Sequence, residues 1–222
     1  SQKVLNLYSR LYFAVNKKIN WSEIYKHFEL RYSFLESLKK QELQYDVTLH
    51  DSLWGWPRHR INLHSQLEKL SSEGFKINSQ LKWGEPKISD GSINEQIDKG
   101  IFPITVGEKI SSYERMLASS RLGVFASGFH WGWRNIMMFC LMTGVPVLTD
   151  KLILTPWFDM NEFILFTNED GDWKSVKDTL LSISNEKLFE YKKINQQYYQ
   201  QVMSPEAVGR YFMNVIQQNL SA

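Results

Sequence analysis

The sequence predicts a doubly wound α/β fold, in which helices cover both faces of a parallel sheet. Two short apolar runs, Leu122–Ala126 and Val145–Leu148, each have the length of a buried strand. The segment Gly132–Met142 between them is predicted to be a helix, and Gly144 follows it where a left-handed C-cap favours glycine. Strand, helix and strand in this order form a βαβ unit, which places its two strands parallel in one sheet.

Further predicted elements extend this unit along the chain. Residues 45–222 are expected to form the α/β domain, and residues 1–44 a helical segment that is either a linker or the remnant of an N-terminal domain. Before the unit, strands are predicted at 45–50, 75–81 and 101–106, helices at 58–72 and 113–119, and a long polar loop at 83–99. After it, a strand is predicted at 163–167, followed by helices at 173–183, 186–202 and 205–220.

The composition is that of an ordinary globular protein, with 43% hydrophobic and 23% charged residues. A net charge of +2 provides no broad basic field for nucleic acid or for an anionic membrane. No apolar run approaches the roughly 20 residues that span a bilayer, and no signal peptide precedes the first strand. The single cysteine, Cys140, excludes an intramolecular disulfide. These features favour a cytoplasmic location, with peripheral membrane association as the other option.

Two predicted helices begin with cationic side chains. Arg58 and Arg60 lie in the first turn after Pro57, and Arg134 follows Gly132 at the start of the βαβ helix. A helix N-terminus already carries about half a positive charge, so cations there are unfavourable unless an anion lies nearby. Because both helices follow strands of one parallel sheet, both N-termini point to its carboxyl edge, where ligands of such sheets bind. We therefore expect a diphosphate site at this edge.

The sequence also allows plainer interpretations of the same residues. The cations could be solvated, or paired with Asp51, Asp150 or a nearby glutamate. His59 and His64 are five positions apart, which does not match a helical metal-binding pair, so we expect no metal.

Three segments in and after the central unit follow the pattern of a known family. They read YERMLASSRLGVFASG, GWRNIMMFCLMTGVPVLTD and LTPWF. They resemble the C-terminal, donor-binding half of GT-B glycosyltransferases, of the exostosin-like and bacterial polysaccharide type. Phe139 is a departure, because many such enzymes have a glutamate there that binds the donor ribose.

The resemblance implies transfer of a sugar from a nucleotide-diphosphate sugar to a hydroxyl of a glycan or glycoprotein acceptor, in glycan or polysaccharide assembly. It places the donor diphosphate on Arg58, Arg60, Ser127, Gly128 and Arg134, and the donor sugar or base on Ser52, Tyr113, His130, Trp131 and Thr155. It implies no cofactor and no metal. The catalytic base of such enzymes usually comes from the other domain, and no catalytic residue is identified in this sequence.

Two rivals to this interpretation follow from the same residues. At 222 residues the chain is shorter than a two-domain GT-B enzyme, so we expect either a fragment or one module whose acceptor domain lies elsewhere. A non-catalytic carbohydrate- or protein-interaction module with the same fold is the main alternative, and Phe139 favours it. An unrelated nucleotide-binding protein is disfavoured, because the sequence has neither a G-x-G-x-x-G pattern nor a P-loop.

Overall fold

The computed structural model describes residues 37–53, 57–82, 113–127, 134–153, 156–169 and 171–220. Contacts within the chain define two compact units, residues 1–37 and 38–222, and nearly all described residues belong to the second. The helices predicted within residues 1–36, the loop at 83–99 and the strand at 101–106 lie outside the described residues. The predicted domain boundary at residues 44 and 45 therefore stays a prediction.

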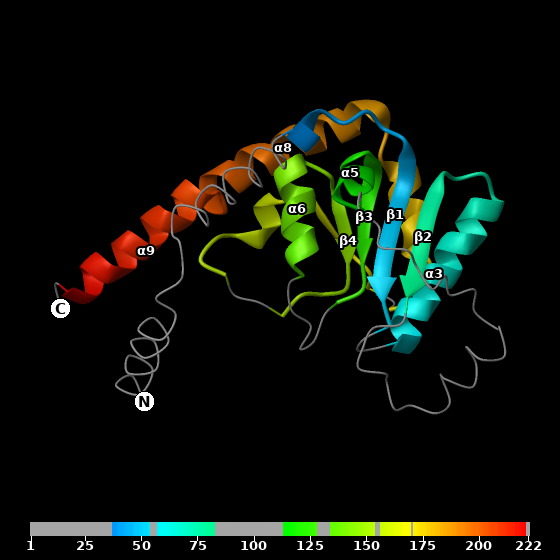
Figure 1. Cartoon of the computed structure of the whole chain (residues 1–222), viewed down its shortest axis with the longest axis horizontal. Coiled ribbons are helices and arrows are strands. Elements are labelled where there is room, and N and C mark those ends of the chain that lie inside the picture. The colour runs from blue at the N-terminus through cyan, green and yellow to red at the C-terminus, as the bar shows by residue number, and fades with distance from the viewer. Residues whose placement is uncertain are drawn as a thin grey trace, which may run out of the picture. The chain divides into compact units, whose positions relative to one another are not determined.

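A five-stranded parallel sheet forms the centre of the second unit (Figure 1). The strand order is β2-β1-β3-β4-β5, so the chain moves outward in both directions from β1. The strands are β1 (Tyr45–Ser52), β2 (Ile77–Lys82), β3 (Ser120–Phe125), β4 (Val147–Thr149) and β5 (Leu165–Thr167). All four pairings are parallel, which confirms the predicted doubly wound α/β class.

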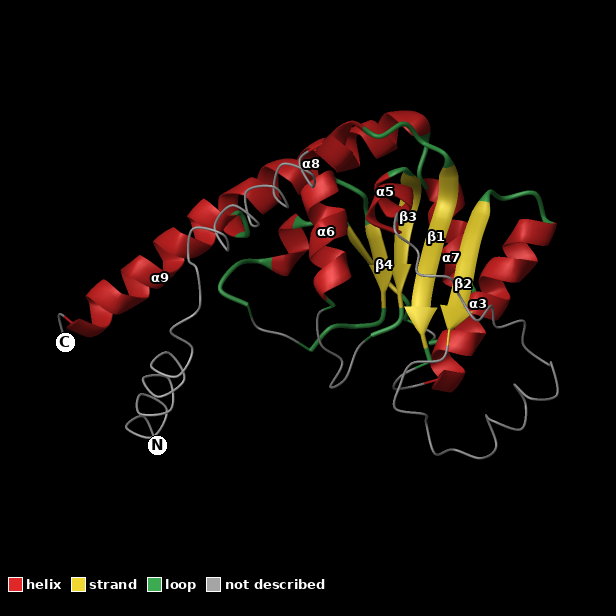
Figure 2. Ribbon diagram, in the orientation of Figure 1, coloured by secondary structure: helices red, strands yellow, loops and turns green. Residues whose placement is uncertain are grey.

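Helices cover both faces of the sheet (Figure 2). In chain order the helical elements are η1 (Leu38–Lys40), α3 (Pro57–Ser72), α5 (Tyr113–Ala118), α6 (Asn135–Thr143), η3 (Met160–Glu162), α7 (Ser175–Ser182), α8 (Asn185–Val202) and α9 (Pro205–Leu220). Helices α5 and α6 lie on one side of the sheet and α7 lies on the other. No helix in the described part of the chain is long and apolar enough to cross a bilayer.

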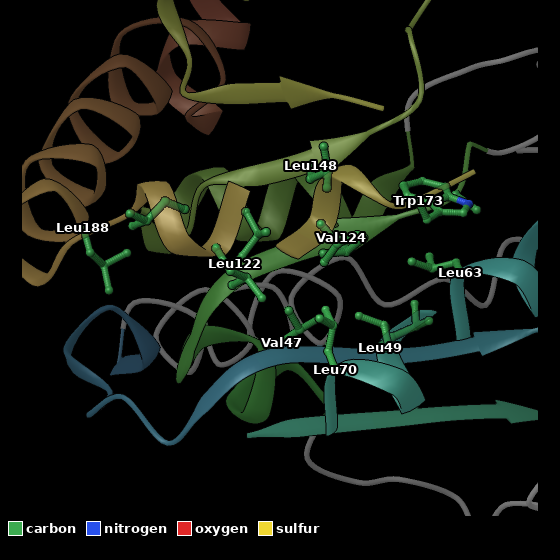
Figure 3. Close-up of a cluster of buried hydrophobic side chains, with 14 residues drawn as sticks. Val47, Leu49, Leu63, Leu70, Leu122, Val124, Leu148, Trp173 and Leu188 are labelled. Carbon is green, nitrogen blue, oxygen red and sulfur yellow. The ribbon is translucent and has the colours of Figure 1, made fainter. Parts of the chain in front are cut away.

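The main core lies between the sheet and helices α3 and α7 (Figure 3). Leu63 of α3 and Val176 of α7 pack there with the strand residues Val47, Leu49 and Val124. Since neighbouring strand residues point to opposite faces, Gly123 faces the α6 side instead. A Cβ atom at Gly123 would lie 2.9 Å from the Sγ atom of Cys140, so glycine allows α6 to approach the sheet closely.

Trp173 corrects one predicted boundary. The helix predicted to begin at Trp173 begins at Ser175, and Trp173 has a left-handed backbone with φ of 64°. Its indole side chain is fully buried in the core, and its backbone N–H donates to Oδ1 of Asn168. Burial of this large side chain and the Asn168 hydrogen bond stabilise a conformation that a β-substituted residue rarely adopts.

Gly144 ends α6 as the sequence predicts. It has φ of 87°, and the N–H groups of Gly144 and Val145 donate to Leu141 and Cys140 carbonyls of the last turn. A Cβ atom at this position would lie 2.5 Å from the backbone oxygen of Lys192 in α8. The glycine is therefore required both by its left-handed backbone and by the closeness of α8.

We predict that Gly144→Ala lowers the free energy of unfolding by about 2–4 kcal/mol, because alanine is strained at positive φ and would press on the backbone of α8. Urea denaturation followed by circular dichroism measures this change. Gly209→Ala in α9 is the matched control, since a Cβ there has no atom within 4 Å. That variant should be as stable as the parent protein or slightly more stable, because alanine favours helix.

Candidate functional site

Polar residues follow the parallel strands at one edge of the sheet. Asp51 lies at the end of β1, Ser127 shortly after β3, Asp150 directly after β4 and Asn168 directly after β5. The carboxyl ends of parallel strands meet at the same edge, so these residues come together although more than a hundred positions separate the first from the last. Their hydrogen bonds form two clusters.

The first cluster joins two helices to β1 through one carboxylate. Nη1 of Arg60 in α3 donates to Oδ1 of Asp51 at 2.7 Å. Arg134 grips the same carboxylate with two N–H groups, Nη1 to Oδ2 at 2.7 Å and Nη2 to Oδ1 at 2.8 Å. The Asp51 side chain is only 3% exposed. We call these three residues the Asp51 cluster.

Both guanidinium groups stay charged in this cluster. Burial alone would lower the pKa of Arg134, but the charge and hydrogen bonds of Asp51 hold it above its usual value. Burial lowers the pKa of Arg60, and the attraction of Asp51 offsets this only in part. Arginine keeps its proton in proteins in either case. Two cations therefore face one anion, and the cluster of three carries one positive charge in excess.

The second cluster is built on Asp150, whose side chain is also only 3% exposed. Its Oδ2 accepts hydrogen bonds at 2.8 Å from Nε2 of His59 and from the backbone N–H of Ser127. Its Oδ1 accepts from Nδ2 of Asn168 at 3.0 Å. Burial would raise the pKa of Asp150, but these three hydrogen bonds together with the charge of His59 hold it below its ordinary value. We call these four residues the Asp150 cluster.

The two clusters bracket the end of β3. Ala126 accepts a hydrogen bond from Arg134 at 3.3 Å, and the next residue, Ser127, donates to Asp150. His59 and Arg60 are neighbours in the first turn of α3, where there is no acidic residue, and each belongs to a different cluster. The start of α3 and the end of β3 thus hold both clusters in one place. The indole of Trp173 supports the arrangement, with its ring centroid 5.0 Å from that of His59.

The structure brings together several residues of the predicted site. Arg60 and Arg134 converge on Asp51, which realises the pairing that the sequence left open. Arg58 is exposed. Tyr113 begins α5 and stacks on the ring of His50, with centroids 4.8 Å apart, and burial raises its pKa. The role of these residues in binding a nucleotide sugar stays a prediction.

Other predicted site residues are placed only in part or not at all. Ser52 ends β1, but its side chain is not among those described. Gly128, His130, Trp131 and Thr155 lie outside the described residues.

The sequence analysis named Asp150 only as a counter-ion and did not name Asn168. The signal that could have found both is a polar residue directly after a short apolar strand, since in a parallel sheet every such residue lies on the ligand-binding edge. Asp150 follows Val147–Thr149, and Asn168 follows Leu165–Thr167.

A hollow of about 570 Å³ lies beside the Asp150 cluster. Its walls come from the ends of β4 and β5 and from the connection between them, which includes η3. The lining residues are Thr149, Asp150, Lys151, Leu152, Pro156, Phe158, Asp159, Met160, Asn161, Phe163, Leu165, Phe166 and Thr167. No group of three or more histidine, cysteine, aspartate or glutamate side chains that could hold a metal occurs among the residues that the structure describes.

Known structures share this architecture. The chain superposes on sucrose-phosphate synthase from Thermosynechococcus elongatus with a TM-score of 0.52 and 11% identity, covering 85% of this chain and 49% of the synthase. It superposes on a TarM variant from S. aureus with a TM-score of 0.51 and 15% identity, covering 79% of this chain and 36% of TarM. Both are GT-B glycosyltransferases. The fold is that of one half of a GT-B enzyme.

This likeness confirms the resemblance expected from the central unit at the level of the fold. The chain spans about half of the synthase and about a third of TarM, so the activity of a whole enzyme does not follow from it. No family model matches the sequence, and no curated protein matches it.

We predict that Asp150→Asn lowers the free energy of unfolding at pH 7 by about 2–3 kcal/mol, because an amide NH₂ would face one of the donors that the carboxylate now accepts. The pKa of Asp150 is lowered on folding, so its contribution to stability is present above about pH 4 and is lost as the pH falls through the folded-state value. Urea denaturation between pH 7 and pH 3 should show a shallower acid loss for the variant.

Asp172→Asn is the control for this prediction, because Asp172 is an aspartate whose ion-pair partner, Lys174, is largely exposed. Its stability curve should overlay that of the parent protein. Equal curves for Asp150→Asn and the parent protein would show that the Asp150 cluster does not stabilise the fold.

Proposed function

We propose that the chain is the donor-binding part of a glycosyltransferase, and that its carboxyl edge binds the diphosphate of a nucleotide sugar. The observation that carries the proposal is the Asp51 cluster. Two guanidinium groups from the starts of two different helices converge at the edge of a parallel sheet where ligands bind. With one carboxylate between them they retain an excess positive charge, which a diphosphate would neutralise.

The helices add to the attraction for an anion. The N-termini of α3 and α6 carry partial positive charge and backbone N–H groups that have no partner within the helix. Arg134 is the N-cap residue of α6, but its side chain makes no capping hydrogen bond and is bound to Asp51 instead. A diphosphate at this edge would accept hydrogen bonds from the helix N-termini and from the guanidinium groups.

The chemistry that follows is electrostatic. In sugar transfer the bond between the anomeric carbon and the diphosphate oxygen breaks, and the leaving diphosphate gains negative charge. Arg60 and Arg134 would stabilise that charge where it develops, and Asp51 would keep both groups in place before the donor binds. This contribution requires no metal.

The known neighbours support a sugar nucleotide as the ligand. The TarM structure contains UDP, and both neighbours are glycosyltransferases. An acceptor hydroxyl on a glycan, a role in polysaccharide or glycoprotein glycan assembly and a cytoplasmic location are parts of the same proposal. The acceptor would be bound by a further domain, as the partial coverage of both neighbours suggests.

A non-catalytic interaction module is the second candidate function. Phe139 favours it, because this side chain is 8% exposed in α6 and provides no carboxylate for a donor ribose at the position where many GT-B enzymes have one. Such a module would bind a glycan or a protein without affinity for nucleotides.

We predict micromolar binding of one nucleotide among UDP, GDP, CDP and TDP, measured by isothermal titration calorimetry. Arg134→Ala and Arg60→Ala should each weaken it about 10- to 100-fold, because each removes a hydrogen bond from a charged group to the phosphate. Arg210→Ala, which removes an exposed arginine from α9, is the control and should not change the affinity. If no nucleotide binds, or if the two site variants bind as well as the control, the proposal is wrong.

We predict that Asp51→Asn makes the protein depend on anions. The variant leaves two guanidinium groups without their shared carboxylate, so it should be less stable by about 3 kcal/mol in buffer without phosphate. Inorganic pyrophosphate should then raise its melting temperature more than it raises that of the parent protein, because the ligand supplies the missing negative charge. Differential scanning fluorimetry measures both shifts, with sodium chloride at matched ionic strength as the control.

Equal shifts for the two proteins would show that pyrophosphate does not bind at the Asp51 cluster.

A further inference from the structure

The hollow beside the Asp150 cluster has the size of a small-molecule site. Its volume of about 570 Å³ lies within the range of about 300–1,000 Å³ that is usual for ligand pockets. It lies at the carboxyl ends of β4 and β5, on the edge where ligands of parallel sheets bind. Neither arginine of the Asp51 cluster lines it, so it is a separate feature of the same edge.

The wall of the hollow is an irregular segment that α8 and α9 hold in place. The backbone N–H of Asp159 donates to the hydroxyl oxygen of Tyr198 in α8 at 3.0 Å. The backbone N–H of Ile164 donates to Oδ1 of Asn195, a buried α8 residue, at 2.7 Å. Trp157 stacks on Tyr211 of α9 with ring centroids 4.9 Å apart. These ties on both sides of η3 preorganise the wall, which lowers the entropy that a ligand must overcome.

Aromatic and hydrogen-bonding groups alternate along this wall. Phe158 and Phe163 line the hollow and contact each other edge to face, and both contact Tyr198 in the same way. Between them lie Asp159 and Asn161. The N–H and the side-chain amide of Asn161 both donate to Oδ1 of Asp159 at 2.9 Å, which fixes that carboxylate and leaves it able to accept further hydrogen bonds.

This combination matches the chemistry of a sugar ring. A pyranose presents C–H groups, which pack on aromatic rings, and a belt of hydroxyl groups, which donate to carboxylate and amide oxygens. Asp150, Asp159 and Asn161 provide such acceptors in the lining, and the exposed Lys151 provides a donor. A phosphate would meet two carboxylates here, so the hollow does not suit an anion.

The spacing of the strands places the hollow one ligand unit from the arginines. Asp51 ends β1, and β4 is two strands away in the sheet. Neighbouring strands lie about 4.8 Å apart, so the nearer wall of the hollow is roughly 10 Å from the Asp51 cluster. Asp150 lies between the two sites, because it lines the hollow and is bound by His59 from α3.

We propose that the hollow formed by β4, β5 and the segment from Lys151 to Phe163 is a binding subsite for a pyranose ring. Its occupant is either the sugar of the donor or a sugar unit of the acceptor glycan, which share the chemistry described above. The inference rests on the proposed function for the identity of the larger ligand. Phe158, Asp159 and Asn161 form the contact surface, and Tyr198 and Asn195 position it.

Saturation-transfer difference NMR on the full chain tests the subsite. The donor arm uses UDP-glucose, UDP-N-acetylglucosamine and GDP-mannose, and the acceptor arm uses maltotriose, cellotriose and chitotriose. Asn161→Trp fills the hollow, and we expect it to weaken sugar binding at least about tenfold. Lys151→Ala removes an exposed lining side chain without burial changes, and we expect a smaller loss in the same arm.

Asn219→Trp, the same substitution at an exposed position of α9, is the matched control and should bind sugar as the parent protein does. If Asn161→Trp does not fold, Lys151→Ala carries the test, because an exposed lysine outside the helices and strands can be truncated without loss of the core. The melting temperature of each variant shows which of the two applies.

The outcomes separate the subsite from the proposed function. Ring-proton signals from a sugar nucleotide that the plug removes assign the donor sugar to the hollow, and the same result with an oligosaccharide assigns the acceptor. Nucleotide binding with no plug-sensitive sugar signal in either arm overturns the subsite and leaves the proposed function standing. Plug-sensitive oligosaccharide binding without any nucleotide binding supports the subsite and overturns the proposed function. No binding in any arm overturns both.

Discussion

The carboxylate of Asp51 is the constraint on which the arrangement of the sheet edge depends. It ends β1, and it binds Arg60 of α3 and Arg134 at the start of α6 with three hydrogen bonds of 2.7 to 2.8 Å. Two helices from opposite faces of the sheet are thereby fixed at one point. A buried carboxylate without these partners would be costly, and so would either guanidinium without the carboxylate. Each of the three charges is tolerated at the edge because the other two are there.

Asp150 repeats this principle one step along the sheet. Its carboxylate is held by a histidine from α3, a backbone N–H after β3 and an amide after β5. The neighbouring hollow has an irregular wall, but the wall is supported by regular elements, since Tyr198 and Asn195 of α8 bind its backbone. The rigid parts of the fold thus position groups that lie on turns and connections, which is where ligand-binding residues usually lie.

These features describe an edge with two complementary environments. The Asp51 cluster carries excess positive charge, whereas the hollow is lined by carboxylates, an amide and aromatic rings. A nucleotide sugar has the corresponding parts, a negatively charged diphosphate joined to a neutral ring rich in hydroxyl groups. The GT-B fold of the chain is consistent with such a ligand, although fold alone does not determine activity.

The sequence by itself determined the features that depend on neighbouring residues. The apolar runs, the helix between them and the cap at Gly144 predicted the βαβ unit, because strand length, helical period and a left-handed cap are local properties. Cations at the starts of two helices predicted a charged edge for the same reason. Only the tertiary structure decided which residues meet there. Arg134 and Asp51 are 83 positions apart, and His59 and Asp150 are 91 apart, so their pairing depends on strand order and on the packing of α3 and α6. The hollow depends on contacts from α8 and α9, which no local pattern in the segment from Lys151 to Phe163 encodes.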